Sequence, residues 1–268
     1  MMDLGTRVRL SMRTTFLRSA IVRARHAGVR REDAFVASYP KSGTTWLRFM
    51  LGQLLSDREM DFDSAEAMIP MVGRHHDAPR VLPDGGRLIK THESYRAVYR
   101  KAVYMVRDGR DVAISYYHHQ VRQGMFEGDL SSFVARFLEG RTEGYGGWHG
   151  HVASWLDSPV ARKGDLLVVR YEDMRRDPLN TMRQVVATLD LATRDEAIRR
   201  VIETNTMERM RGKEASATVV KKKRDDIPIV RKGKPGEWRE VLSEGDRAAF
   251  VRRAGPMLTR LAYDVEGG

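Results

Sequence analysis

The chain has 268 residues, of which 41% are hydrophobic and 31% are charged, a composition that suits a globular protein with a sizeable core. It contains no cysteine, which excludes disulfides, thiolate zinc sites, iron–sulfur clusters and a cysteine nucleophile. The formal net charge of +11 favours anionic partners, such as nucleic acid, an anionic membrane surface or a phosphate-rich small molecule.

Residues 1–31 form a basic arm that we expect to be helical and to precede a single domain at residues 32–268. Arginines interrupt the apolar residues of the arm, so no secretory signal can be drawn there. No apolar run in the chain approaches the roughly 18 residues that span a bilayer. We expect a cytoplasmic protein without a transmembrane segment, whose arm packs on the domain. Weak contact with an anionic membrane is the alternative.

Three apolar runs without polar alternation are typical of buried parallel strands, namely residues 34–39, 102–106 and 166–169. Residues 88–89 could belong to a fourth strand. Helical patterns follow the three runs, at residues 44–55, 111–121 and about 178–189. This alternation predicts an α/β fold with a doubly wound, mainly parallel sheet flanked by helices. Ligands of such sheets bind beyond the carboxyl ends of the strands, here just after residues 39, 89, 106 and 169.

Two features are expected beyond the last strand. Thr193 and Glu196 have the spacing of a capping box, which predicts that a helix opens there. Residues 211–236 are dense in basic side chains and lack a helical pattern, so they are expected to form a surface loop.

The segment between the first strand and its helix, residues 37–46, has the composition of an anion site. Backbone N–H groups and the positive end of the helix dipole meet there, and Gly43 lets the backbone approach an anion closely. Lys41 adds a positive charge, and Thr44 and Thr45 add hydroxyl donors. The lysine precedes the glycine and the first glycine of a Walker A motif is missing, which disfavours a P-loop nucleotide hydrolase.

Residues 39–46, Tyr-Pro-Lys-Ser-Gly-Thr-Thr-Trp, resemble the 5′-phosphosulfate loop of sulfotransferases that use 3′-phosphoadenosine-5′-phosphosulfate (PAPS). The resemblance implies a P-loop-like phosphosulfate-binding loop in which Lys41 reaches the bridging oxygen that leaves with the 5′-phosphate. It also implies that Trp46 stacks on the adenine base. The loop residues implied to bind the nucleotide are Lys41, Ser42, Gly43, Thr44, Thr45 and Trp46.

Three further segments resemble motifs of the same family, in the same order along the chain. Arg107 and Ser115 have the separation found in the 3′-phosphate motif. Residues 171–174, Tyr-Glu-Asp-Met, resemble an element whose tyrosine, here Tyr171, contacts the adenine. Arg231, Lys232 and Gly233 resemble the C-terminal element that closes over the 3′-phosphate.

The chain departs from the family pattern at two adenine positions. Asn205 stands where relatives often have threonine, and Met207 where they often place an aromatic ring. The segment that forms the dimer contact in many cytosolic relatives is not found after Trp238, so the oligomeric state does not carry over from the family.

Residues 90–92, Lys-Thr-His, follow a predicted strand and resemble the family's catalytic element. We expect His92 to be the general base, because an ordinary histidine pKa near 6.5 leaves the neutral form available at physiological pH. Lys41 is expected to stabilise the leaving oxygen, and Lys90 to hold the sulfuryl oxygens. Glu93 is the rival candidate for the general base. The histidine pairs at residues 75–76 and 118–119 are weaker candidates. Their spacing does not predict a metal site.

The sequence therefore predicts a sulfotransferase that moves a sulfuryl group from PAPS to an acceptor hydroxyl or amine, without a metal, and releases adenosine 3′,5′-bisphosphate (PAP). The acceptor could be a small molecule, a carbohydrate or a lipid, and nucleic acid is not expected as a partner. Residues 60–86 and 122–150 are expected either to line the pocket for the acceptor or to pack in the core. A small-molecule kinase that uses Mg-ATP is the first alternative, and a basic nucleic-acid-binding protein is the second.

Overall fold

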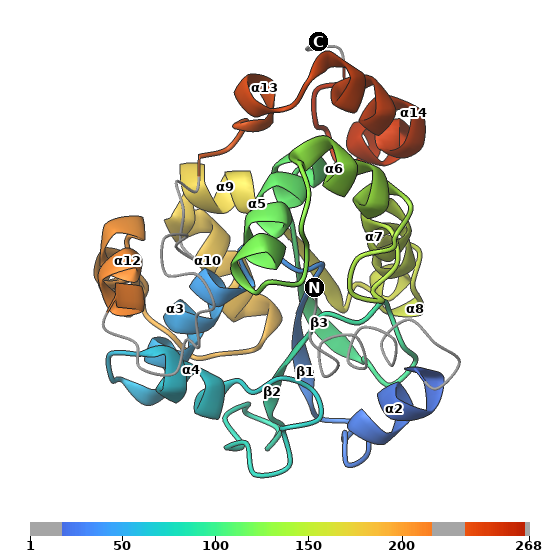
Figure 1. The fold of residues 1–268 in the computed structure, drawn as a ribbon. Helices are drawn as coiled ribbons and strands as arrows, with labels where there is room; N and C mark the ends of the chain where they lie inside the picture. The colour runs from blue at the N-terminus through green and yellow to red at the C-terminus, as the bar shows by residue number, and fades with distance from the viewer. Residues whose placement is uncertain (1–17, 216–233, 266–268) are drawn as a thin grey trace.

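The computed structural model describes residues 18–215 and 234–265. Its central sheet has four strands, and helices surround the sheet (Figure 1). The strands are β1 (Ala34–Ser38), β2 (Leu88–Thr91), β3 (Lys101–Val106) and β4 (Leu166–Arg170). They lie in the order β2-β1-β3-β4, and every pairing is parallel. The predicted α/β fold is confirmed, and the doubtful fourth strand at residues 88–89 is real and extends to Thr91.

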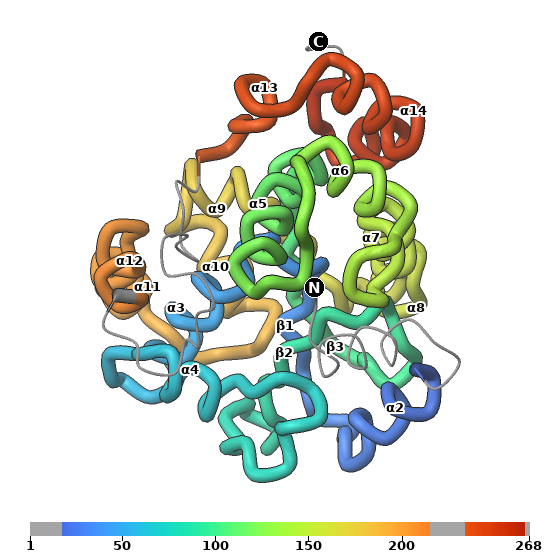
Figure 2. The backbone as a smooth tube through the Cα atoms, viewed as in Figure 1, coloured from blue at the N-terminus to red at the C-terminus, as the bar shows by residue number. Residues whose placement is uncertain are grey.

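Helices connect and flank the strands. In chain order they are α2 (Arg18–Arg25), α3 (Thr44–Ser56), α4 (Phe62–Met68), α5 (Gly109–Arg122), α6 (Leu130–Leu138), α7 (Trp148–Leu156), α8 (Pro159–Arg162), α9 (Tyr171–Arg176), α10 (Pro178–Thr188), α11 (Asp195–Thr204), α12 (Met207–Ala215), α13 (Trp238–Val241) and α14 (Glu244–Arg260). Figure 2 shows α11 and α12 beside α3, on the opposite side of the molecule from α7.

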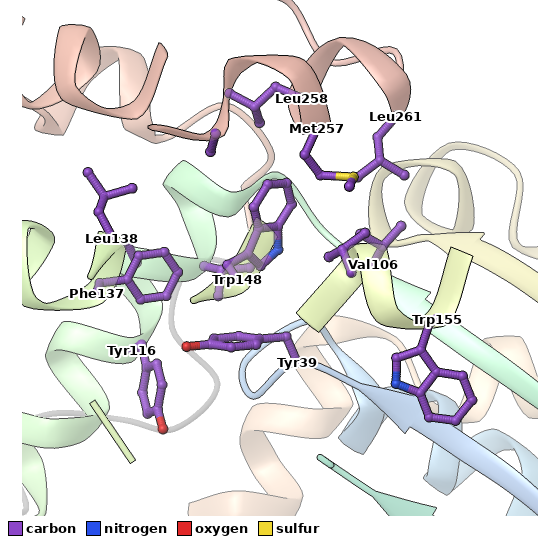
Figure 3. Packing of buried hydrophobic residues seen from close by; sticks show 14 of the residues in the cluster. Tyr39, Val106, Tyr116, Phe137, Leu138, Trp148, Trp155, Met257, Leu258 and Leu261 are labelled. Carbon is purple, nitrogen blue, oxygen red and sulfur yellow. The ribbon is translucent and has the colours of Figure 1, made fainter. Parts of the chain in front are cut away.

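The sheet is buried on both faces, because alternate strand residues point into two separate cores. On one face Phe35 and Tyr104 pack with residues of α5, α6, α7 and α14. Figure 3 shows part of this core, with Trp148 of α7 lying beneath Leu258 of α14. On the other face Val36 and residues of β3 pack with α3, α10 and α11. This two-sided burial explains why the strands lack polar alternation.

Two helices, α5 and α11, begin at residues other than those predicted from the sequence. Helix α5 begins at Gly109, two residues before the prediction, because the side chain of Asp108 caps it by accepting from Arg110 N at 3.0 Å. The predicted capping box at Thr193 is wrong. Helix α11 starts at Asp195, its N-cap is Arg194, and that residue makes no side-chain cap.

The predicted loop at residues 211–236 is also partly wrong, because residues 211–215 belong to α12. Residues 216–233 lie outside the described part of the chain. Of the basic arm, residues 18–31 are described, and Val22 of α2 is buried against the rest of the protein. In the part of the chain that the structure describes, no helix is both long enough and apolar enough to cross a bilayer.

Candidate active site

The carboxyl ends of the four parallel strands meet at one edge of the sheet, and each is followed by residues singled out in the sequence. Residues 39–46 follow β1, His92 follows β2, Arg107 follows β3 and Tyr171 follows β4. A cavity of about 390 Å³ lies over this edge. The topology therefore brings together motifs that are more than 100 residues apart in the sequence.

Most of the predicted site residues line this cavity. They are Lys41, Gly43, Thr44, Thr45, Trp46, Lys90, His92, Arg107, Ser115, Tyr171 and Met207. Ser42 and Asn205 do not line it, and Arg231, Lys232 and Gly233 lie outside the described residues.

The loop between β1 and α3 presents the N-terminus of a 13-residue helix to the cavity. Gly43 is the N-cap and makes no side-chain hydrogen bond to the first turn of α3. The N–H groups of that turn are therefore oriented toward the cavity end, where the helix dipole favours an anion. The hydroxyl of Thr44 is hydrogen-bonded to that of Ser38. Ser42 is buried, and its hydroxyl has no hydrogen-bond partner among the described residues.

Gly43 is required by the packing of the loop against Tyr171. Its φ of +97° is a backbone conformation that residues with a side chain rarely adopt. A Cβ atom there would lie 2.6 Å from Cδ2 of the Tyr171 ring. The close approach of loop and ring thus depends on glycine.

A second positive group faces the cavity from the end of β3. Arg107 is buried, its Nη2 lies 3.6 Å from Oδ2 of Asp111, and its guanidinium lies 4.7 Å from the centre of the Tyr171 ring. No described residue accepts a hydrogen bond from its Nε. Ser115 lines the same cavity from α5. A guanidinium and a hydroxyl so placed suit a phosphate group.

Residues 236–238 of the C-terminal segment are hydrogen-bonded beside Arg107. Asp111 accepts hydrogen bonds from Gly236 N at 2.8 Å and from Trp238 N at 3.0 Å, and Glu237 lines the cavity. Burial raises the pKa of Asp111, although Arg107 nearby opposes the rise. The residues that follow the Arg231–Gly233 motif are thus held next to Arg107.

Aromatic rings and methionine form another part of the wall. The rings of Trp46 and Tyr171 meet edge to face with their centres 6.2 Å apart, and Met207 lies on the same cavity. Asn205 sits behind this wall and is fully buried. Its carbonyl accepts from Trp46 Nε1 at 2.7 Å, while its side-chain amide donates to Gln53 Oε1 at 2.7 Å. Asn205 therefore holds the indole ring in place from behind.

His92 is held in one tautomer. Its Nδ1 lies 2.9 Å from the carbonyl oxygen of Ser38. A carbonyl can only accept, so Nδ1 carries the proton of the neutral ring and Nε2 is left as an acceptor. Burial and the neighbouring charge of Lys90 hold the pKa of His92 well below 6.5. The ring is therefore neutral at physiological pH and able to take up a proton at Nε2.

Two lysines face the same space. Burial lowers the pKa of Lys41 to about 8, and the charges of Arg122 and Arg107 act in the same direction. Burial lowers the pKa of Lys90 to about 7, assisted by the charge of Arg48. Both shifts show that positive charge is concentrated in a poorly solvated site, a state that a bound anion would stabilise.

Glu93, the rival base, does not line this cavity. Its carboxylate is buried and pairs with Arg18 Nη2 of α2 at 2.8 Å, while Arg25 Nη1 lies 3.8 Å away. It lines a separate pocket together with Arg18. The arrangement uses Glu93 to fasten the N-terminal helix to the domain.

The remaining wall of the cavity combines apolar and polar side chains, with Phe49 and Met210 among the apolar ones. From the two ranges considered for an acceptor pocket, Phe62, Ala65 and Tyr145 line the cavity, whereas Met60, Phe126 and Trp148 are buried in the cores. Four polar residues of this wall were not expected from the sequence: Arg48, Glu66, Tyr116 and Glu143. His119, expected only as a weaker candidate base, also lines the cavity. His119 could have been placed in the site from the sequence, because it lies four positions after Ser115 on a predicted helix. Among the described residues there is no cluster of three or more side chains able to hold a metal ion.

Comparison with known proteins agrees with this geometry. A family model described as a sulfotransferase domain matches residues 31–259. Sulfotransferase 1B1 of Mus musculus is 27% identical over 234 residues, which cover 79% of this chain and 77% of the relative. Sulfotransferase 1E1 of Rattus norvegicus is 27% identical over 246 residues, covering 82% and 81% of the two chains.

Solved structures share the fold. A mouse sulfotransferase complexed with PAP superposes with a TM-score of 0.65 at 22% identity, covering 86% of this chain and 89% of that one. Retinol dehydratase in complex with androsterone and inactive cofactor PAP gives a TM-score of 0.70 at 20% identity, covering 88% and 82%. Because the family match takes in nearly the whole region that forms the sheet and the cavity, the chain belongs to the sulfotransferase family.

Proposed function

We propose that the protein transfers a sulfuryl group from PAPS to an acceptor hydroxyl or amine. The observation that carries the proposal is one cavity lined by two groups of residues suited to phosphate and by His92, Lys41 and Lys90. The loop at Gly43 suits the 5′-phosphate, and Arg107 with Ser115 suits the 3′-phosphate. An ATP site requires no second phosphate site of this kind, so a Mg-ATP kinase is the weaker candidate.

His92 acts as the general base of the proposed reaction. Its Nε2 accepts the proton of the acceptor, whose oxygen or nitrogen forms a bond to sulfur as the bond from sulfur to the bridging oxygen breaks. The electron pair stays on the leaving phosphate oxygen, where Lys41 stabilises the charge, and Lys90 interacts with the sulfuryl oxygens. The products are the sulfated acceptor and PAP, and no metal takes part.

The nucleotide is bound by the residues that the family resemblance implied. Lys41, Ser42, Gly43, Thr44 and Thr45 surround the 5′-phosphate. Trp46, Tyr171 and Met207 contact the adenine, with Asn205 acting indirectly by holding Trp46. Arg231, Lys232 and Gly233 close over the 3′-phosphate.

The acceptor is a small molecule, a carbohydrate or a lipid rather than a nucleic acid. It approaches His92 from the wall formed by Tyr145 and its polar neighbours. We further propose that residues 32–268 act as one domain in the cytoplasm. The basic arm packs on this domain and makes at most weak contact with a membrane.

Thermal denaturation with three ligands tests the nucleotide part of this proposal. PAP at about 100 times its Kd should add roughly 2.7 kcal/mol to the free energy of unfolding. For a protein of this size the melting temperature should rise by about 5–10 °C. 5′-AMP should give a smaller shift at the same concentration and ionic strength. A shift with Mg-ATP alone would make the kinase the leading candidate, and no shift with any ligand would remove the nucleotide site.

A further inference from the structure

The segment that carries His92 lies beyond the end of the sheet. Strand β2 ends at Thr91, so the backbone groups of residues 92–95 need partners other than a neighbouring strand. Side chains of α7 supply them. His151 Nε2 lies 3.1 Å from the carbonyl oxygen of His92, and Trp155 Nε1 donates to the carbonyl oxygen of Glu93 at 3.1 Å.

A third contact comes from the same face of α7. Tyr95 N donates to Ser154 Oγ at 3.1 Å. Positions 151, 154 and 155 are spaced as i, i+3 and i+4, so their side chains project from one side of the helix. This face of α7 therefore forms hydrogen bonds to the backbone of three residues in the segment that carries the proposed base.

The protonation of His151 follows from its two partners. The carbonyl oxygen of His92 can only accept, so His151 carries its proton on Nε2. Its Nδ1 then accepts from the hydroxyl of Tyr104, 2.9 Å away on β3. Both side chains are fully buried. Burial lowers the pKa of His151 to about 4, so the ring stays neutral over the physiological range.

His92 is thus fixed at two points. Its ring Nδ1 is bonded to Ser38 of β1, and its own carbonyl is bonded to His151 of α7. The direction in which Nε2 points into the cavity depends on both contacts. His151 itself does not line the cavity, so it can act on the reaction only through His92.

We propose that His151 is a positioning residue of the reaction, which holds the backbone of His92 so that the ring keeps one tautomer and one orientation. Tyr104 supports it by fixing the tautomer of His151. The proposal rests on the proposed function, in that His92 is taken as the general base. A misplacement of a catalytic group by about 1 Å can lower the rate by about 100-fold, which sets the scale of the effect on turnover.

Histidine side-chain NMR tests the proposal without knowledge of the acceptor. The full chain, saturated with PAP, is titrated from pH 8 to pH 5, and the ring nitrogens of His92 are observed in the wild type and in two variants. His151→Leu removes both hydrogen bonds. His151→Gln is the matched control, because its amide can still donate to the carbonyl of His92 and accept from Tyr104. The His92→Ala variant identifies the signals of His92.

In the wild type and in His151→Gln, His92 should remain in the Nδ1–H tautomer, with a pKa well below the ordinary value. In His151→Leu it should become a mixture of tautomers, and its pKa should rise toward the ordinary value of about 6.5. The same tautomer and the same titration in His151→Leu as in the wild type would overturn the proposal. So would equal changes in the leucine and glutamine variants.

A second variant and the affinity for PAP separate loss of folding from loss of positioning. If His151→Leu does not fold, Tyr104→Phe carries the test. It removes one of the two hydrogen bonds that hold the His151 ring and should move the His92 titration in the same direction by a smaller amount. An unchanged titration in that variant would then overturn the proposal. PAP affinity should stay within about threefold in every folded variant. Absence of PAP binding by the wild type would refute the proposed function instead, whatever the state of His92.

Discussion

Replacing Gly43 by alanine would test whether the phosphate loop and the aromatic wall are built as one unit. The added Cβ would lie 2.6 Å from Cδ2 and 3.1 Å from Cε2 of the Tyr171 ring, on a backbone with φ of +97°. To reach an ordinary contact of 3.4 Å, the loop and the ring must separate by about 0.8 Å. Tyr171 is buried and holds Arg107 against its face, so it cannot move alone.

Two costs add in this variant. Left-handed backbone costs a residue with a side chain about 1–2 kcal/mol, and an overpacked contact costs about 1–3 kcal/mol. The free energy of unfolding should therefore fall by about 2–5 kcal/mol, which corresponds to a melting temperature lower by roughly 5–15 °C. Because the loop amides move with the backbone, PAP affinity should fall at least tenfold, or about 1.4 kcal/mol.

The chain offers a matched control at Gly85. This glycine also has a positive φ, +80°, but a Cβ there would meet no heavy atom within 4 Å. Gly85→Ala should show the backbone cost alone, a few degrees in melting temperature, and no change in PAP affinity. Calorimetric titration with PAP and thermal denaturation of both variants give the comparison. Equal losses in the two variants, or unchanged PAP affinity in Gly43→Ala, would refute the reasoning.

Three other predictions concern charge. Because the pKa values of Lys41 and Lys90 are lowered to about 8 and about 7, part of the free protein lacks these charges at pH 8, and an anion favours the charged forms. PAP binding at pH 8 should therefore take up protons, seen as a binding enthalpy that depends on the ionisation enthalpy of the buffer, and should not do so at pH 6. A buffer-independent enthalpy at pH 8 would contradict the lowered values. Arg107→Ala should lower PAP affinity by about 1.5–3 kcal/mol, since it removes charged hydrogen bonds to a phosphate, and should change 5′-AMP affinity far less. Equal losses for the two nucleotides would remove Arg107 from the 3′-phosphate site. Glu93→Gln should lower the melting temperature by loosening α2 while sulfation of any accepted substrate continues, whereas His92→Ala should abolish sulfation. If Glu93→Gln lost turnover as completely as His92→Ala, the role of general base would pass to Glu93.

The sequence predicted the sheet well because its strands are buried on both faces. Such strands are continuous apolar runs, and those at residues 34–39, 102–106 and 166–169 lie within one residue of the observed strands at each end. The phosphate loop and Arg107 could be found because each follows a strand directly. Their meeting at one edge follows from parallel topology alone.

The polar wall of the cavity could not be predicted in the same way. Arg48 and Glu66 form an ion pair at 2.8 Å between α3 and α4, and nothing in their spacing of 18 residues indicates that the two helices face each other there. Glu143 accepts a hydrogen bond from Tyr116, which depends on how a loop after α6 folds back over α5. The support of His92 by α7 is likewise set by tertiary packing, since the two segments are about 60 residues apart.

The parallel sheet also shapes how the chain must fold. Each strand pairing joins residues more than 50 positions apart, as Ala34 does with Leu88, so no pairing within the described sheet can form as a local hairpin. During synthesis on the ribosome, β1 emerges first, with its fully buried Phe35 and Val36, and must wait for the distant strands that cover it. We expect slow refolding from denaturant and a strong demand for chaperones while this apolar segment is uncovered.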